Sequence, residues 1–317
     1  MPVKIDVDKI IALLAKGEPR AIAKAITLVE DDLPGAERLL ASLDQKNINA
    51  CLVIGVTGPP GVGKSTLTGE LVTLFRSQGK RVGVIAVDPS SPLSGGAVLG
   101  DRVRMMAHSL DRDVVVRSMA ARGSLGGICR AAGAVLRIMG SSGCHVVIIE
   151  TVGVGQSEID IVQLADLTLM VTAPGMGDEI QAMKAGILEV ADLIVINKAD
   201  HPGADNAVVD MEAVLKERGI RDGAFTKVHK TVASEGKGIA ELAVQLEALA
   251  HVYQESGEQG KRRTKAYQTE VFAWAMELLK PQIQRKVSAY AGQSAIDPRL
   301  KAKEIITREM KNMDFDK

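Results

Sequence analysis

The spacing of apolar residues divides the chain into a helical start and a longer region of alternating strands and helices. Between residues 6 and 46, apolar positions return at helical spacing, which predicts helices that bury one face. After residue 50, short β-branched runs bounded by turn residues predict strands, with helical patterns between them. The predicted strands cover residues 51–57, 81–87, 114–116, 145–149, 167–172, 193–196 and 226–232. This alternation predicts an α/β fold with a doubly wound, mostly parallel sheet covered by helices on both faces.

The end of the chain has a different pattern. Residues 257–265 (GEQGKRRTK) combine glycine with basic residues, and we expect a domain boundary there. Residues 267–290, with a break at Pro281, and residues 298–313 then predict amphipathic helices. The expected parts are an N-terminal helical segment at 1–48, an α/β domain at 49–256 and a helical extension at 257–317. The apolar face of the extension must be covered by the sheet or by a second copy of the chain, and we favour a homodimer.

Composition disfavours nucleic acids and membranes as partners of this chain. Lys+Arg and Asp+Glu both number 39, so no net charge attracts nucleic acid or an anionic membrane. Aromatic residues make up only 3%, which disfavours stacking platforms for single-stranded nucleic acid. No apolar run approaches the roughly 18 residues of a membrane-spanning helix. The three cysteines share no C-x-x-C spacing, which favours reduced thiols in a cytoplasmic protein, or in the mitochondrial matrix if a presequence has been removed.

A glycine-rich motif follows the first strand predicted for the sheet. Residues 58–66 (GPPGVGKST) match G-x-x-x-x-G-K-[S/T], with an apolar strand before them and a helical pattern after them. Backbone N–H groups of such a turn bind a phosphate chain, while the lysine bridges its β- and γ-phosphates and the hydroxyl binds Mg²⁺. The flanking strand and helix argue against a chance turn with a stray lysine. The predicted phosphate-binding residues are Gly58, Pro59, Pro60, Gly61, Val62, Gly63, Lys64, Ser65 and Thr66.

A second motif indicates the base of the nucleotide. Asn197, Lys198 and Asp200 follow a predicted strand as N-K-x-D. A carboxylate accepts from the N1–H and the 2-amino group of guanine, whereas adenine has an acceptor at N1, so Asp200 favours GTP over ATP. Asn197 would hold the base edge and order the loop, and the stem of Lys198 would cover the ring. A second guanine loop is expected at Val232, Ala233 and Ser234.

Acidic residues at other strand ends predict the metal site. Glu150 and Gly153 stand where D-x-x-G is expected, so the carboxylate would reach the Mg²⁺ shell and the glycine N–H would meet the γ-phosphate. Asp88 and Asp101 are further metal candidates, although a role as turn or helix caps is nearly as good an interpretation. Val154 follows Gly153 where a water-orienting glutamine would speed the reaction, so we expect slow hydrolysis that a partner stimulates. The predicted catalytic residues are Lys64, Asp101, Glu150 and Gly153.

A polar stripe lies on the helix predicted at residues 178–190. Asp178, Gln181 and Lys184 are spaced i, i+3 and i+6, whereas apolar residues occupy the opposite positions. By periodicity alone this stripe is a solvated helix face.

Longer segments resemble one known family. GPPGVGKS is followed in order by VDPSSPLSGGAVLGDRVRM, ARGSLGGI, ETVGVGQSE, APGMGDEIQAMKAGI and NKAD. Over about residues 6–255 the chain resembles the MeaB/ArgK family of G-protein metallochaperones, whose mitochondrial relative serves human methylmalonyl-CoA mutase. The tail after Lys261 resembles the family's helical dimerisation extension only loosely. The usual serine of the last guanine loop is Val232 in this chain, so the resemblance implies no serine contact at this position.

This resemblance implies a function. It implies a P-loop GTPase domain at 49–256 that uses GTP or GDP and Mg²⁺, and a protein that loads, protects and reactivates an adenosylcobalamin-dependent acyl-CoA mutase. The adenosyltransferase that supplies the cofactor is a further candidate partner. By the same resemblance Asp88, Asp101 and Glu150 belong to the metal and first-switch region and Gly153 begins the second switch. Asp178, Gln181 and Lys184 would form a third switch that couples the nucleotide to the mutase.

Three other functions are open at this point. The first is an ATP-dependent kinase or transport-linked ATPase for basic amino acids, which Asp200 disfavours. The second is an adaptor that senses a nucleotide without hydrolysing it. The third is a nickel-insertion GTPase, for which a histidine-rich or C-x-x-C tract would be expected, whereas the five histidines of this chain are scattered.

Overall fold

The computed structural model of the chain describes residues 6–89, 110–121, 131–151, 163–176, 188, 190–217, 227–288 and 297–310. The chain divides into two compact units, residues 1–266 and 267–317, and each is described by itself. Among the helices of the described ranges, none combines the length and apolar character that crossing a bilayer requires.

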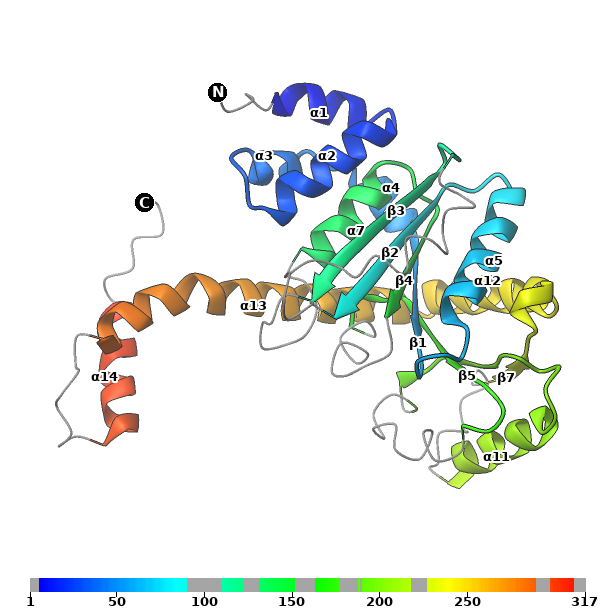
Figure 1. Cartoon of the computed structure of the whole chain (residues 1–317). Helices are drawn as coiled ribbons and strands as arrows, with labels where there is room; N and C mark the ends of the chain where they lie inside the picture. The colour runs from blue at the N-terminus through cyan, green and yellow to red at the C-terminus, as the bar shows by residue number, and fades with distance from the viewer. Residues whose placement is uncertain are drawn as a thin grey trace. The chain divides into compact units, whose positions relative to one another are not determined.

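A twisted parallel sheet forms the centre of the first unit (Figure 1). Its described strands are β1 (Leu52–Thr57), β2 (Val82–Pro89), β3 (Val114–Ala121), β4 (Val146–Thr151), β5 (Leu167–Thr172), β6 (Leu193–Ile196) and β7 (Lys227–Lys230). They stand in the order β3-β2-β4-β1-β5-β6-β7, and every described pairing is parallel. Because β2 to β4 lie on one side of β1 and β5 to β7 on the other, the winding changes direction beside β1. The doubly wound parallel sheet is therefore confirmed.

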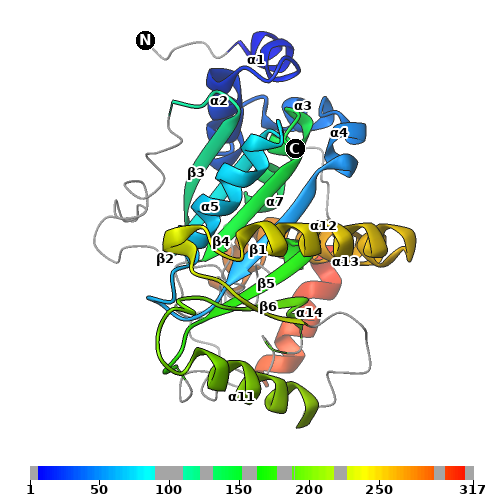
Figure 2. The same cartoon turned by 90° about the vertical axis from the view of Figure 1, so that its right-hand side faces the viewer.

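Helices cover both faces of this sheet (Figures 1 and 2). The described helices of the first unit are α1 (Val7–Leu14), α2 (Pro19–Glu30), α3 (Ala36–Ala41), α4 (Gln45–Ala50), α5 (Lys64–Ser77), α7 (Ala132–Ser141), α11 (Ala204–Glu217) and α12 (Ile239–Glu255), with the 3-10 turn η2 (Ala233–Glu235). The N-terminal helices and α7 pack with Ile85 and Ile149, whereas α5 and α12 pack with Val84 and Ile148. Neighbouring strand residues point to opposite faces, so the two clusters are separate layers of the core.

The edge strand β3 is longer than its sequence pattern predicts. It runs from Val114 to Ala121 rather than over residues 114–116 and pairs with β2 along its whole length. The polar residue Arg117 ended the predicted run, but its guanidinium bonds to Glu30 of α2 and so fits an edge position. The strand therefore continues past Arg117 because pairing with β2 stabilises it even where the sequence is polar.

The break expected at residues 257–265 is confined to one turn. Gly257 has a φ of +75°, and α13 (Glu258–Ser288) begins directly after it and continues through Pro281. The glutamate, glutamine, lysine and arginine residues of this stretch are good helix formers, which explains the helix there. The predicted domain boundary at residue 257 stays a prediction. The compact units divide after Ala266, and the second unit also contains α14 (Pro298–Met310).

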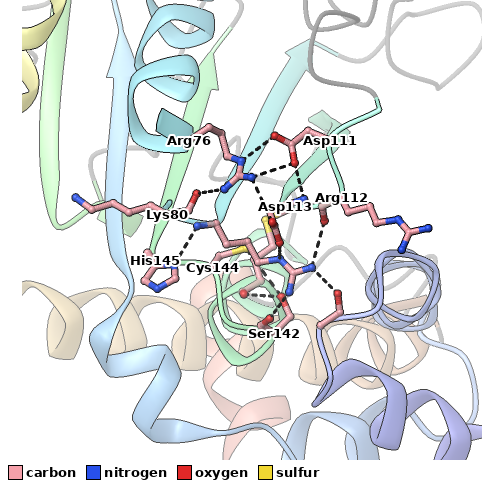
Figure 3. A network of polar contacts seen from close by, with 11 residues as sticks. Arg76, Lys80, Asp111, Arg112, Asp113, Ser142, Cys144 and His145 are labelled. Atoms are coloured by element: carbon pink, nitrogen blue, oxygen red, sulfur yellow. Dashed lines mark hydrogen bonds and ion pairs between the residues drawn. The ribbon is translucent and has the colours of Figure 1, made fainter. Parts of the chain in front are cut away.

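Polar side chains close the amino-terminal edge of the sheet beside β2, β3 and β4 (Figure 3). Arg76, at the end of α5, donates from Nε to Asp111 at 2.8 Å and from Nη1 to the carbonyl of Lys80 at 2.7 Å. The backbone N–H of Arg81 donates to Nδ1 of His145 at 3.0 Å. These contacts hold the strand starts together, at the edge opposite to the strand ends that carry the predicted motifs.

Candidate functional site

The loop after β1 has a shape that requires glycine at two points. Gly58 has a φ of +141°, and a Cβ atom there would stand 2.0 Å from the carbonyl oxygen of Val171. Gly63 has a φ of +97°, and its Cβ would stand 2.4 Å from Nδ2 of Asn197. The loop therefore lies directly against β5 and against the N-K-x-D motif, and a side chain at either glycine would push it away. This close approach is how the sequence forms a backbone cradle at the start of α5.

Two polar side chains of the first turn of α5 face the strand ends. Lys64 is 6% exposed, and its Nζ donates to the carbonyl oxygens of Gly58 at 2.7 Å and Pro59 at 2.9 Å. The hydroxyl of Ser65 donates to a carboxylate oxygen of Glu150, which is buried at the end of β4. The structure thus brings together the lysine, the hydroxyl and the carboxylate that the sequence pattern assigned to phosphate and metal.

Asn197 joins three segments of the site. Its side chain is buried, and Nδ2 donates to the carbonyl oxygen of Val62 at 2.8 Å. Its Oδ1 accepts from the hydroxyl of Thr231 at 3.0 Å and from the N–H of Ala233 at 3.0 Å. We call residues 58–66 the phosphate loop and residues 231–238 the last loop. One amide therefore holds the phosphate loop, the end of β6 and the last loop together. Thr231 was missed in the sequence, because a single threonine after a short strand carries no spacing signal.

Lys198 and Asp200 form the solvent side of the N-K-x-D motif. Lys198 has a φ of +57°, which is uncommon for a residue with a side chain, and its Nζ donates to the carbonyl oxygen of Gly61 at 2.8 Å. Asp200 is exposed. A hydrogen bond from Lys237 to Glu235 and the charge of that carboxylate raise the pKa of Lys237, and the charge of Asp200 adds to this effect.

Comparison with known proteins identifies the family. The family model described as "Methylmalonyl Co-A mutase-associated GTPase MeaB" matches residues 22–289. The chain belongs to the MeaB family. It is 43% identical over 287 residues to a candidate GTPase of Pyrococcus horikoshii, covering 90% of each chain. It is 34% identical over 294 residues to the methylmalonic aciduria type A homolog, mitochondrial, of Mus musculus, covering 87% of this chain and 70% of the relative.

A solved structure supports the same fold. The crystal structure of an LAO/AO transport system kinase superposes with a TM-score of 0.68 at 25% identity, covering 98% of this chain and 99% of the other. The resemblance to the MeaB family inferred from the motifs is therefore confirmed, and so is the nucleotide-binding P-loop fold with its helical C-terminal region.

Of the remaining residues predicted for a MeaB-family site, some lie within the described ranges and others lie outside them. Within the segments that the motifs mark, Pro60, Thr66 and Ser234 are exposed and Val232 is buried. The side chain of Asp88 lies outside what the structure describes. The following predicted residues also lie outside the described ranges: Asp101, Gly153, Val154, Asp178, Gln181 and Lys184. Their roles stay predictions.

The donor set at the start of α5 fits Mg²⁺. This ion prefers hard oxygen ligands and usually keeps waters and substrate phosphates in its shell. The Ser65 hydroxyl and the Glu150 carboxylate supply two such oxygens side by side. In the described part of the chain no group of three or more His, Cys, Asp or Glu residues could hold a metal by itself. The site therefore suits an ion that shares its coordination with a nucleotide.

Proposed function

We propose that the chain binds GTP with Mg²⁺, hydrolyses it to GDP and phosphate, and uses this cycle to load, protect and reactivate an adenosylcobalamin-dependent acyl-CoA mutase. The observation that carries the nucleotide part is Asn197, which joins the phosphate loop to the N-K-x-D motif and the last loop. The family description and the mouse relative's name support methylmalonyl-CoA mutase or a related enzyme as the client.

The residues of the site have separate roles in this proposal. Lys64 would exchange the carbonyl oxygens of Gly58 and Pro59 for the phosphate oxygens of GTP. Ser65 and Glu150 would hold Mg²⁺, which would neutralise charge on the β- and γ-phosphates. Water attacks the γ-phosphate, and Asp101 and Gly153 are proposed to act near that atom, with no glutamine directly after the glycine. We therefore propose slow hydrolysis by the isolated protein and faster hydrolysis with a partner.

The choice of base can be tested with Asp200→Ala. The carboxylate of Asp200 would accept two hydrogen bonds from guanine, and charge-assisted bonds contribute about 1.5–3 kcal/mol. The variant should lose roughly ten- to hundredfold in GDP affinity, with little change in its weak affinity for ADP. Competition titrations with a fluorescent GDP analogue measure both. If ATP displaced this analogue from the wild type as well as GTP does, this would support instead an ATP-dependent kinase or transport-linked ATPase, the class to which the name of the similar LAO/AO transport system kinase points.

The partner can be tested by phosphate release under multiple turnover. Addition of the client mutase should accelerate phosphate release from GTP, and Gln181→Ala or Lys184→Ala should remove this acceleration while GTP affinity stays near that of the wild type. Unchanged stimulation in both variants would contradict a third switch. Absence of phosphate release with every cobalamin-dependent acyl-CoA mutase tried would favour an adaptor that does not hydrolyse GTP.

The proposal also covers the oligomeric state of the chain. We propose a cytoplasmic homodimer, or a matrix one if a presequence is removed, that forms through the second unit. There α13 exposes Phe272, Met276 and Leu278. The adenosyltransferase that supplies the cofactor is proposed as a further partner.

A further inference from the structure

Two buried carboxylates hold neighbouring strands at the amino-terminal edge of the sheet. Asp166 and Asp192 directly precede β5 and β6, and their side chains are 3% and 4% exposed. An Oδ2 atom of Asp166 accepts the N–H of Val53 in β1 at 2.9 Å. The Oδ2 atom of Asp192 accepts the N–H of Thr168 in β5 at 2.7 Å. Each aspartate thus fixes the strand beside its own, and burial of an ionised carboxylate is costly unless a cation pairs with it.

Consecutive arginines at the start of α13 supply these cations. Arg262 donates to both carboxylate oxygens of Asp192, at 2.8 and 2.9 Å. Arg263 donates from Nε and Nη2 to the two oxygens of Asp166, both at 2.7 Å. We call these four residues the arginine clamp. Both pairs are bidentate, a geometry that the planar guanidinium provides and a lysine does not.

Further contacts extend the clamp across the edge. Arg262 also donates to the carbonyl oxygen of Asp166 at 3.0 Å, and the hydroxyl of Tyr253 donates to Asp192 at 2.6 Å. Arg263 donates to the carbonyl oxygen of Cys51, the residue before β1, at 2.6 Å. The clamp therefore fixes the starts of β1, β5 and β6. The ends of β1 and β6 carry the phosphate loop and the N-K-x-D motif, and the end of β5 contacts the phosphate loop at Gly58.

We propose that Arg262 and Arg263 are positioning residues for the nucleotide site at the opposite edge of the sheet. The proposal rests on the guanine-nucleotide site proposed above. By anchoring these strand starts, the arginines keep the register of β1, β5 and β6 in which Asn197 reaches Val62. Loosening a strand start lets the loop at its other end depart from the geometry that binds phosphate or base, so nucleotide affinity depends on the first turns of α13.

Amide hydrogen exchange of the full chain tests whether the two arginines anchor the starts of the strands. Arg263→Gln should speed exchange of the Val53 amide and leave the Thr168 amide close to wild type, whereas Arg262→Gln should do the reverse. Arg263→Lys and Arg262→Lys keep the charge and lose the bidentate geometry, so they should show smaller changes at the same amides. Equal acceleration at both amides in every variant, or none in any, would overturn the assignment.

GDP affinity tests the positioning role. In the two glutamine variants the Kd for GDP should rise about three- to tenfold. The control is Arg117→Gln, which removes another part-buried ion pair of the same unit, with Glu30, from the edge strand β3. It should lower Tm and leave the Kd for GDP within about twofold of the wild type. Equal Kd values in the wild type and both clamp variants, or an equal rise in the control, would overturn the positioning role alone, whereas a wild type that binds no GDP would overturn the site itself.

Discussion

At the scale of single residues, the site is held together by buried side chains that hydrogen-bond to more than one segment of the chain. The amide of Asn197 is an example, because its oxygen accepts two hydrogen bonds and its nitrogen donates to the phosphate loop. An amide in this position ties the loops together, in addition to the base contact proposed for it. Changes at its partners should therefore affect phosphate binding and base binding together.

Thr231→Val should weaken this tie. The change keeps the shape and removes the hydroxyl that donates to Asn197, so stability should fall by about 1–2 kcal/mol and GDP affinity severalfold. Urea unfolding and GDP titration measure the two effects. Thr231→Ser keeps the hydroxyl and should stay near the wild type. A valine variant with unchanged GDP affinity would show that Ala233 alone suffices to hold the amide.

The raised pKa of the buried thiols allows a prediction about how slowly they react with an alkylating reagent. Burial raises the pKa of the Cys144 thiol to about 11 and raises that of Cys51 as well. A raised pKa keeps the thiol neutral, so at pH 8 the folded protein should react with iodoacetamide at Cys144 roughly a hundredfold more slowly than the unfolded chain. Mass spectrometry of the Cys144 peptide, with and without urea, measures the ratio. Comparable labelling in both conditions would contradict the burial.

Sequence patterns identified the residues with motif spacing and missed those without it. Asn197 and Asp200 were predicted as site residues because N-K-x-D follows a strand. Thr231 was not found, because one hydroxyl has no periodic signal. Arg262 and Arg263 were interpreted as part of a charged break, since their aspartate partners lie about 70 and 97 positions away along the chain. Pairing across such distances can be seen only in the fold.

At the scale of elements, the strands and their loops were largely predictable. The bounds of β5 and β6 agree with the apolar runs at residues 167–172 and 193–196, because buried parallel strands read as continuous apolar segments. The edge strand β3 and the start of α13 were not predictable in the same way. Their polar residues are stabilised by Glu30 in one case and by buried aspartates in the other.

The phosphate loop provides a matched pair of substitutions. Gly58→Ala would place a Cβ atom 2.0 Å from a backbone oxygen of β5, so it should destabilise the protein by about 3 kcal/mol or more and abolish GDP binding. Gly61→Ala also requires a positive φ, of +78°, but meets no atom within 4 Å, so its cost should be about 1–2 kcal/mol. Thermal unfolding and GDP titration distinguish the two, and equal losses would contradict the steric explanation.

At the scale of the whole molecule, balanced charge leaves recognition to local surfaces. The second unit has an α13 segment without buried residues, and apolar side chains stand on it at helical spacing. Such a segment is expected to find a partner surface in solution, and we propose a second copy of the chain.

Phe272→Glu should therefore prevent dimer formation. Phe272 is 67% exposed on α13, and a buried charge at a dimer interface is costly. Sedimentation equilibrium should give the monomer mass for this variant and twice that mass for the wild type. Val244→Glu on α12, where the side chain is 64% exposed, is the control and should remain a dimer. A monomeric wild type would contradict the proposed assembly.

The contact between Arg263 and Asn49 has a consequence for synthesis of the protein. The guanidinium donates to the carbonyl oxygen of Asn49 at 3.0 Å across 214 positions of sequence. A ribosome must therefore release the chain beyond residue 263 before the sheet edge can close, although the strands themselves are complete earlier. Until then Asp166 and Asp192 lack their cations, and the nascent chain is open to chaperones and proteases. Chains truncated before this point should therefore be degraded faster than the full-length chain, and they should bind nucleotide more weakly.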